Sequence, residues 1–209
     1  MGIEDRRERE RLARREAILT GARELFLSKG FNGTTMDEVA QMAELSKGTL
    51  YLYFTSKEEL YVTVMSEGLK ILFDRIEQAS ALDLPPDQMI RKLGEVYYRY
   101  YLDHREYFRI LFFLEHGDVS KQLPRELIQE NLERGIRCLR LYAGVVQKGI
   151  DEGVFSAVDP WKAAVAFWGA TNGILFLFEG ELNKEIIRMD LDQLIDHTLD
   201  LFIEAFRKK

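Results

Sequence analysis

Apolar residues recur every three or four positions along most of the chain, and no segment shows the strict alternation that marks a half-buried strand. The first such segment, at about 9–29, has one apolar stripe that contains Ile18, Ala22, Leu25 and Phe26. Only four prolines occur, and the long intervals between them are rich in Leu, Glu, Arg and Ala, which favour helix. The sequence therefore predicts an all-α fold.

Capping residues and glycines predict where individual helices begin and end. Gly30 is suited to end the first helix in a left-handed conformation, and Ser56 with Glu59 forms a capping box that opens the fourth. Asp159 followed by Pro160 marks the start of another helix, and Asp190 caps the last. We expect about nine helices, at 9–29, 36–43, 47–54, from 57 past 76, 87–103, 105–115, 124–152, 160–179 and from 191 past 202.

Composition indicates the class of protein. Hydrophobic residues make up 46% and charged residues 31% of the 209 positions, which is typical of a soluble globular protein. The single cysteine, Cys138, cannot form an internal disulfide and suits a reducing compartment. The longest apolar run, at 174–178, is far shorter than the ~20 residues that cross a membrane, and the charged N-terminus does not resemble a signal peptide. We expect a cytoplasmic protein with no membrane partner.

Charge is unevenly distributed along the chain. The net charge is −6, yet between positions 6 and 15 there are six arginines and only two glutamates. A basic arm on an acidic body fits a protein that meets DNA at one end. The alternative is a solvated, charged helix start, because charge runs are most often solvent-facing. Whether this arm adds phosphate or minor-groove contacts stays open on the sequence alone.

Two short predicted helices, at 36–43 and 47–54, are joined by a tight turn and have helix-turn-helix spacing. Ala40 is small where the two helices would cross, and Leu45 would fill the turn. The second helix also offers side chains that its core does not need and that suit base edges or phosphates, namely Lys47, Gly48, Thr49, Tyr51 and Tyr53. This pattern points to DNA binding, although Tyr51 and Tyr53 could instead stabilise the small domain.

The run from Gly30 to Leu60, GFNGTTMDEVAQMAELSKGTLYLYFTSKEEL, resembles the signature of the TetR/AcrR family of bacterial transcriptional regulators. The similarity covers about 11–65, under a third of the chain. One departure is Glu44 with Leu45, where the family usually has Gly-Val, and a carboxylate near phosphate would weaken binding locally. The resemblance implies a three-helix DNA-binding domain at 1–56 and a helical effector-binding and dimerisation domain at 57–209.

The same resemblance implies roles for individual residues. Phosphate contacts are expected from Thr34, Thr35, Tyr53 and Lys57. Base or groove contacts are expected from Lys47, Gly48, Thr49 and Tyr51.

The second half of the chain is unusually aromatic and offers no motif. Aromatic residues at helical spacing are usually core, but so many of them can also enclose an apolar pocket with a few polar groups. The residues proposed to bind a ligand there are Tyr101, Arg109, Phe112, His116, Trp168, Asn172 and Phe176. Small residues at 166, 170 and 173 allow close helix approach, either within one subunit or, as the resemblance implies, in a homodimer through the last two helices.

The sequence thus predicts a ligand-responsive repressor that leaves a palindromic operator when a small, largely apolar molecule binds its C-terminal domain. The expected partners are double-stranded operator DNA, an unknown effector and a second copy of the chain. The three histidines and Cys138 lie far apart in sequence and have no metal-ligand spacing, and we find no catalytic motif and expect no cofactor. The alternatives are a small helical enzyme and an interaction module that keeps the helix-turn-helix as scaffold.

Overall fold

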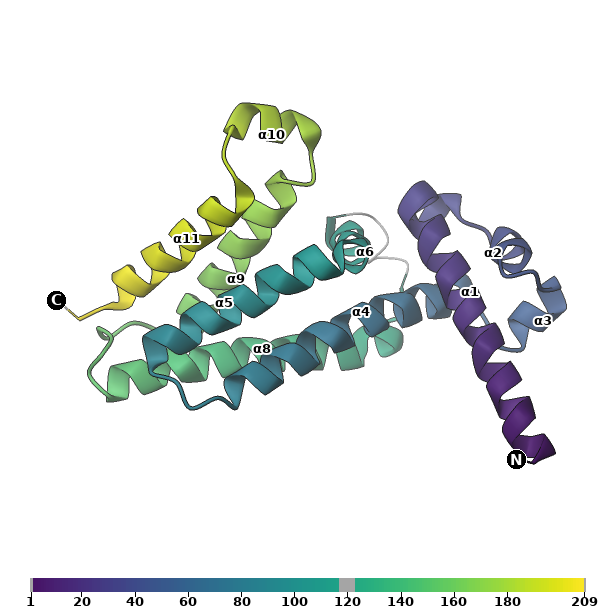
Figure 1. The fold of residues 1–209 in the computed structure, drawn as a ribbon, viewed down its shortest axis with the longest axis horizontal. Coiled ribbons are helices and arrows are strands. Elements are labelled where there is room, and N and C mark those ends of the chain that lie inside the picture. Colours follow the sequence, from purple (N-terminus) through teal and green to yellow (C-terminus); the bar gives the residue numbers. More distant parts are fainter. Residues whose placement is uncertain (1, 117–122, 209) are drawn as a thin grey trace. The chain divides into compact units, whose positions relative to one another are not determined.

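The computed structural model describes residues 2–116 and 123–208, and within these two stretches the regular elements are helices. An isolated β-bridge joins Phe155 to Arg207. The helices are α1 Ile3–Gly33, α2 Met36–Met42, α3 Lys47–Tyr51, α4 Lys57–Ser80, α5 Pro86–Asp103, α6 Arg105–His116, α8 Arg125–Asp151, α9 Pro160–Leu177, α10 Glu181–Ile187 and α11 Leu191–Phe206 (Figure 1). The all-α prediction is confirmed.

The described residues contain ten helices, one more than the approximate number of nine that the sequence predicted. The additional helix is α10, which is only seven residues long. Its Ile186 is largely exposed, so no buried stripe marks the segment in the sequence. Two boundaries also differ, since α1 begins at Ile3 rather than near residue 9 and α3 ends at Tyr51 rather than 54.

The chain divides into two compact units. Unit 1 comprises Met1–Lys70 and His104–Asn131, and unit 2 comprises Ile71–Asp103 and Leu132–Lys209. Both α4 and α8 contribute to each unit, and the division of α4 falls between Lys70 and Ile71. The expected domain boundary after residue 56 stays a prediction.

The core of unit 1 forms where α1, α4 and α6 meet. Phe26 of α1 packs edge-on against Tyr61 of α4, with ring centroids 4.8 Å apart. The buried Tyr61 hydroxyl donates a hydrogen bond of 2.9 Å to the carbonyl oxygen of Ile110 in α6. Because an unpaired buried hydroxyl would cost about 1–3 kcal/mol, this bond lets the ring pack deep in the core.

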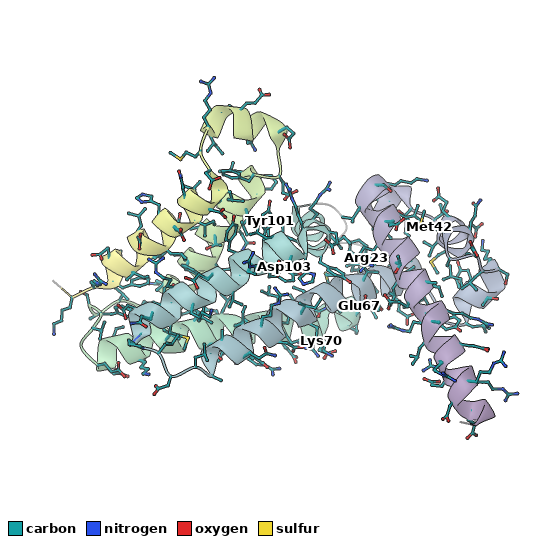
Figure 2. The ribbon with its side chains drawn as sticks, viewed as in Figure 1. Arg23, Met42, Glu67, Lys70, Tyr101 and Asp103 are labelled. Atoms are coloured by element: carbon teal, nitrogen blue, oxygen red, sulfur yellow. The ribbon has the colours of Figure 1, made fainter. Side chains whose placement is uncertain are left out.

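A second contact of α1, α4 and α6 surrounds Tyr107. Arg23 of α1 donates a hydrogen bond to the Tyr107 hydroxyl, and its guanidinium carbon lies 5.2 Å from the ring centroid. Glu67 of α4 lies in the same region, and burial raises the pKa of its carboxyl group (Figure 2). Gly68 allows the close packing, because a Cβ there would come 2.5 Å from Cβ of Tyr107.

Gly30 ends the regular part of α1, as the sequence predicted. Its φ of 69° and ψ of 176° are non-helical, and one further turn continues to Gly33. Glycine tolerates this positive φ without the steric penalty that a Cβ would bring. The resulting bend redirects the chain into α2.

Unit 2 packs α5 and α9 against α11. Gly94 of α5 brings the helices close together, since a Cβ at this position would lie 2.3 Å from Cδ2 of Leu199 and 3.1 Å from Cζ of Phe167. Tyr142 of α8 stacks on Phe167, with ring centroids 4.5 Å apart. Its hydroxyl is buried and has no hydrogen-bond partner within the described residues.

The described residues form neither a membrane-spanning helix nor a metal-binding cluster. None of the described helices combines the length and hydropathy required to cross a membrane. The described histidine, cysteine and acidic side chains form no cluster of three or more that could hold a metal ion.

Candidate nucleic-acid interface

Side-chain caps fix the starts of α2 and α3. Thr35 caps α2 in a reciprocal box with Glu38, whose carboxylate accepts hydrogen bonds from the Thr35 backbone amide and hydroxyl, both at 2.9 Å. Hydrogen bonds from Lys29 and Thr35 lower the pKa of Glu38 to about 2. Ser46 caps α3 by accepting a 3.1 Å hydrogen bond from the backbone amide of Thr49. Both short helices therefore have defined starting points.

The turn between α2 and α3 has an unusual residue. Glu44 has a φ of 56°, in the left-handed region that glycine occupies more readily. The backbone amide of Leu45 then donates a 2.9 Å hydrogen bond to the Ala40 carbonyl oxygen. The turn closes although Glu44 stands where the family usually has glycine. The Glu44 carboxylate is exposed beside α3.

The inner side of α3 is buried, and most of its polar residues lie outside. Leu50 and Phe54 belong to the core of unit 1. Thr35, Lys47, Gly48 and Tyr51 are exposed, while Thr49 and Tyr53 are half-buried. Apart from Thr34 and Lys57, the predicted DNA-contacting residues thus lie at least partly on the surface of one helix pair.

Lys47 is held by its neighbour in α2. Its ammonium nitrogen lies 2.7 Å from a carboxylate oxygen of Asp37, and both side chains are exposed. The hydrogen bond with Asp37, together with the charge of its carboxylate, raises the pKa of Lys47. The ion pair orients Lys47 in the free protein and neutralises part of the positive charge of α3.

Thr34 and Lys57 lie deeper than the sequence prediction implied. The Thr34 side chain is 1% exposed and donates a 2.8 Å hydrogen bond to the Gly30 carbonyl oxygen. Its predicted phosphate contact is incompatible with this burial. Lys57 donates hydrogen bonds to the carbonyl oxygens of Phe31, at 2.8 Å, and Thr34, at 3.1 Å. The predicted phosphate contact of Lys57 stays a prediction, and in this structure its ammonium group stabilises the α1–α2 junction.

Leu52 is a surface residue that the sequence analysis missed. Its side chain is 85% exposed, directly after α3 and beside the exposed Tyr51. The signal in the sequence is its position two residues from each of the core residues Leu50 and Phe54. In a helical chain this spacing places Leu52 on the outer side. An apolar side chain beside these polar groups can contact thymine methyl groups.

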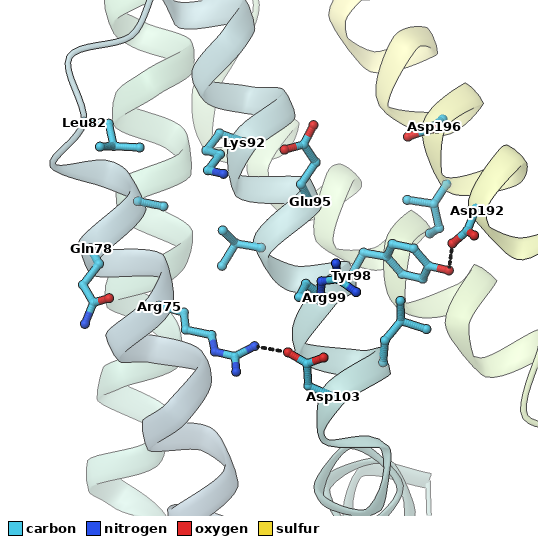
Figure 3. A pocket seen from close by; sticks show the side chains of 14 residues that line it. Arg75, Gln78, Leu82, Lys92, Glu95, Tyr98, Arg99, Asp103, Asp192 and Asp196 are labelled. Carbon is cyan, nitrogen blue, oxygen red and sulfur yellow. Dashed lines mark hydrogen bonds and ion pairs between the residues drawn. The ribbon is translucent and has the colours of Figure 1, made fainter.

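A groove of about 840 Å³ lies in unit 2 between α4, α5 and α11 (Figure 3). Charged side chains line much of it, and an ion pair of 2.9 Å joins Arg75 to Asp103. The Tyr98 hydroxyl donates to Asp192, and burial together with that carboxylate raises the pKa of Tyr98. None of the residues predicted to bind a ligand lines this groove.

The structure does not bring the predicted ligand-binding residues together in one described unit. Tyr101 is buried and donates a 2.7 Å hydrogen bond to Glu179. Asn172 accepts a 2.8 Å bond from the Tyr97 hydroxyl. Arg109 belongs to unit 1, unlike these residues. The remaining candidates are Trp168 and Phe176, two exposed aromatics of α9, and Phe112 and His116, whose side chains the structure does not describe.

One side of α9 is apolar and exposed. Trp161, Val165, Trp168 and Phe176 are exposed at helical spacing, opposite the buried side that contains Phe167. At Gly169 and Gly173 a Cβ would meet no atom within 4 Å. An exposed apolar helix face of this kind is typical of a protein–protein contact.

Comparisons with known proteins agree with this geometry. Residues 18–64 match the family model of bacterial regulatory proteins, tetR family. The uncharacterised HTH-type transcriptional regulator YhgD of Bacillus subtilis is 28% identical over 83% of this chain and 90% of its own length. The HTH-type transcriptional repressor NicS of Pseudomonas putida is 34% identical over 46% of each chain.

Solved structures share the fold over nearly the whole chain. The TetR family regulator PfmR of Thermus thermophilus is 25% identical, with a TM-score of 0.75 over 91% of this chain and 99% of its own. AibR, solved with isovaleryl coenzyme A and operator DNA, has a TM-score of 0.73 at 20% identity and covers 90% of this chain and 97% of its own. The named relatives are regulators, which supports regulation over enzymatic activity. Residues 18–64 are thus similar to the DNA-binding segment of bacterial regulatory proteins of the tetR family, and over most of its length the chain is similar to helix-turn-helix transcriptional regulators.

Proposed function

We propose that the protein is a homodimeric repressor that binds a palindromic operator through α3 and is released when a small, largely apolar molecule binds its C-terminal part. The observation that carries the DNA-binding proposal is the exposed group of Lys47, Tyr51 and Leu52 on the outer side of a helix whose inner residue, Leu50, is fully buried. Such a helix can enter a major groove without disturbing its own core.

Each exposed side chain has a role in this proposal. Lys47 reads guanine or neutralises a phosphate after its ion pair with Asp37 opens or rotates. The Tyr53 hydroxyl donates a hydrogen bond to a phosphate oxygen, Tyr51 contacts a base edge or the groove wall, and Leu52 contacts thymine methyl groups. Thr35, Gly48 and Thr49 complete the surface, and Lys57 joins it if its ammonium group turns from the backbone to a phosphate.

The dimer is proposed to form through the exposed face of α9, extended by Leu201 of α11. Large aromatic side chains beside open glycines suit a helix interface, because the aromatics supply buried area and the glycines permit close approach. A two-fold dimer would place two recognition helices in successive major grooves about 34 Å apart, so the operator would be a near-palindrome.

The proposed effector site lies in the aromatic interior of unit 2. Tyr142 supports this placement, because its buried hydroxyl has no partner among the described residues and would pair with a polar group of a bound ligand. The structure of AibR with isovaleryl coenzyme A and operator DNA supports a two-ligand arrangement in this fold. Release would require the effector to prefer the DNA-free state by about 1–3 kcal/mol.

The DNA-binding proposal is tested by fluorescence anisotropy on the DNA upstream of the protein's own gene. Lys47→Ala should weaken specific binding by about 1–3 kcal/mol, roughly 5- to 150-fold. Lys148→Ala is the matched control, because Lys148 is also an exposed lysine near a carboxylate, that of Glu152, but lies in unit 2. A folded wild-type protein that binds no operator at low salt would instead support the interaction module.

The sign of regulation needs a separate test, because the relatives include both the repressor NicS and the activator FasR. In a reporter strain that carries the upstream DNA, removal of the protein should increase expression. A decrease would contradict repression and leave DNA binding itself intact.

A further inference from the structure

We propose that Arg7, Arg11 and Arg14 form a row on the N-terminal extension of α1 that binds the DNA phosphate backbone beside α3. This inference rests on the proposed DNA-binding function and assigns the phosphate contacts to a surface outside the helix-turn-helix pair. Figure 1 shows the first turns of α1 continuing past α3 toward the N-terminus.

The helix-turn-helix pair itself has little positive charge to offer a phosphate backbone. Between positions 34 and 57 there are two lysines and three carboxylates. Lys47 is paired with Asp37, and Lys57 donates to backbone carbonyl oxygens. Because phosphate neutralisation supplies much of the affinity of DNA-binding proteins, cations from elsewhere in the protein must take part.

The arginine row continues the inner face of α1. Steps of four, three and four residues lead from Arg7 through Arg11 and Arg14 to the fully buried Ile18. On a helix with 3.6 residues per turn these positions share one side. The side of α1 that packs into unit 1 farther along the helix is therefore the side on which the three arginines extend.

The ring contact of Arg15, the neighbour of Arg14, places the row near the C-terminal end of α3, and the electrostatic effect of Tyr53 on Arg11 agrees with this placement. The pKa of Arg11 is raised, first by its hydrogen bond with Glu8 and more weakly by the phenol of Tyr53, which is therefore within electrostatic range. One turn later, the guanidinium carbon of Arg15 lies 5.5 Å from the ring centroid of Phe54. A duplex that contacts Tyr51 and Tyr53 would thus meet the arginine row next.

Within the row Arg11 is paired with Glu8 at 2.7 Å, but the other two arginines differ from those on the opposite side of the extension. Arg7 and Arg14 have no hydrogen-bond or ion-pair partner among the described residues, so their charges are available. On the opposite side, Arg6 pairs with Glu10 at 2.9 Å and Arg9 donates to the Asp5 carbonyl oxygen at 3.2 Å. The distance along the axis from Arg7 to Arg14 is about 10 Å, close to three base-pair steps of a DNA strand.

The test compares two double variants that remove the same charge from the same helix. Arg7→Gln with Arg14→Gln changes the proposed row, and Arg6→Gln with Arg9→Gln changes the opposite side. Binding of the full-length protein to a duplex of about 30 base pairs with arbitrary sequence is measured by anisotropy from about 50 to about 200 mM salt. Circular dichroism confirms that both variants stay folded.

The row variant should reduce the slope of log K against log[salt] by about 0.9 for each phosphate that is no longer neutralised, hence by about 2 for each arm. The control should keep the wild-type slope, because charges facing away from the duplex are screened beyond about 10 Å at 0.1 M salt. Equal slopes for the two variants would overturn the row and leave the proposed function standing. A wild-type protein that binds no duplex would overturn both.

Discussion

The helix-turn-helix of unit 1 and the α5–α9 contact of unit 2 are stabilised by polar side chains in different ways. In the helix-turn-helix of unit 1 the cap pairs are local, since Thr35 meets Glu38 and Ser46 meets Thr49, each three residues away. In unit 2 the Tyr97 hydroxyl meets Asn172, 75 residues farther along the chain. A surface built from local contacts can be recognised in a sequence, whereas an interior built from distant helices becomes visible only after folding.

The two units also differ in what they expose. The surface around α3 in unit 1 exposes mainly polar groups beside Leu52, whereas α9 of unit 2 exposes a face of large apolar side chains. This difference fits a unit that meets DNA and a unit that meets a second copy of the chain. Substitutions in each unit test whether the two surfaces have these separate roles.

The largest effect is expected at Trp168, which is 41% exposed on α9. Trp168→Glu should weaken dimerisation by about 3 kcal/mol or more, over 100-fold, because a carboxylate would be buried at an aromatic contact. Analytical ultracentrifugation measures the dissociation constant. Leu52→Glu is the control, since it should weaken DNA binding and leave the dimer intact. A Trp168→Glu protein that remains fully dimeric would contradict the proposed interface.

The next effect concerns helix packing. Gly68→Ala should reduce the free energy of unfolding by about 1–3 kcal/mol, because the new Cβ would overlap the Tyr107 side chain near its backbone. A methyl group at Gly144 of α8 would meet no atom within 4 Å, so Gly144→Ala should stabilise the protein by up to about 1 kcal/mol. Urea denaturation measures both changes. Stabilisation by both variants would mean that α4 and α6 can separate at no cost.

Removal of the backbone strain at Glu44 should change the free energy of unfolding by less than Gly68→Ala does, and in the opposite direction. Glu44→Gly should raise the free energy of unfolding by about 0.5–1 kcal/mol, because glycine adopts the φ of 56° without steric conflict. It should also strengthen DNA binding by removing a carboxylate beside α3. Thermal denaturation and anisotropy test the two parts, and Glu44→Gln is the matched control that removes the charge and keeps the strain.

The smallest effect is a dependence on pH. Glu38 titrates with a pKa of about 2 in the folded protein and near 4.3 when unfolded, so its ionised form stabilises the start of α2 above pH ~4.3. This contribution should disappear as the pH falls from about 4.3 toward 2. Glu38→Gln should remove that part of the acid dependence, as followed by amide hydrogen exchange in α2. Parallel pH profiles for variant and wild type would argue against the cap.

The sequence predicted those parts of the fold that are encoded by neighbouring residues. Asp190 and the buried stripe of α11 identify that helix, and Gly30 bends the chain where expected. The short helix α10 was missed because its exposed Ile186 leaves no apolar stripe. The early start of α1 was missed because its first turns are charged on all sides and contact no core.

The candidate sites also contain features that neighbouring residues encode and features that depend on distant residues. The exposed positions of α3 could be predicted because Leu50 and Phe54 fix which side faces inward. The burial of Thr34 could not, because it depends on the bend at Gly30 and on Lys57, which lies 23 residues away. Tyr101 was proposed as a ligand contact, but its partner Glu179 is 78 residues away and cannot be inferred from spacing.

Lys57 has a mechanical consequence. Its ammonium group, at the first turn of α4, holds two carbonyl oxygens at the α1–α2 junction, and its ammonium nitrogen lies 4.3 Å from the Phe31 ring centroid. The side chain acts as a strut, so an axial rotation of α4 would carry the start of α2 with it. Loss of that cation, for example by acetylation, would let α4 rotate without moving α2 and α3.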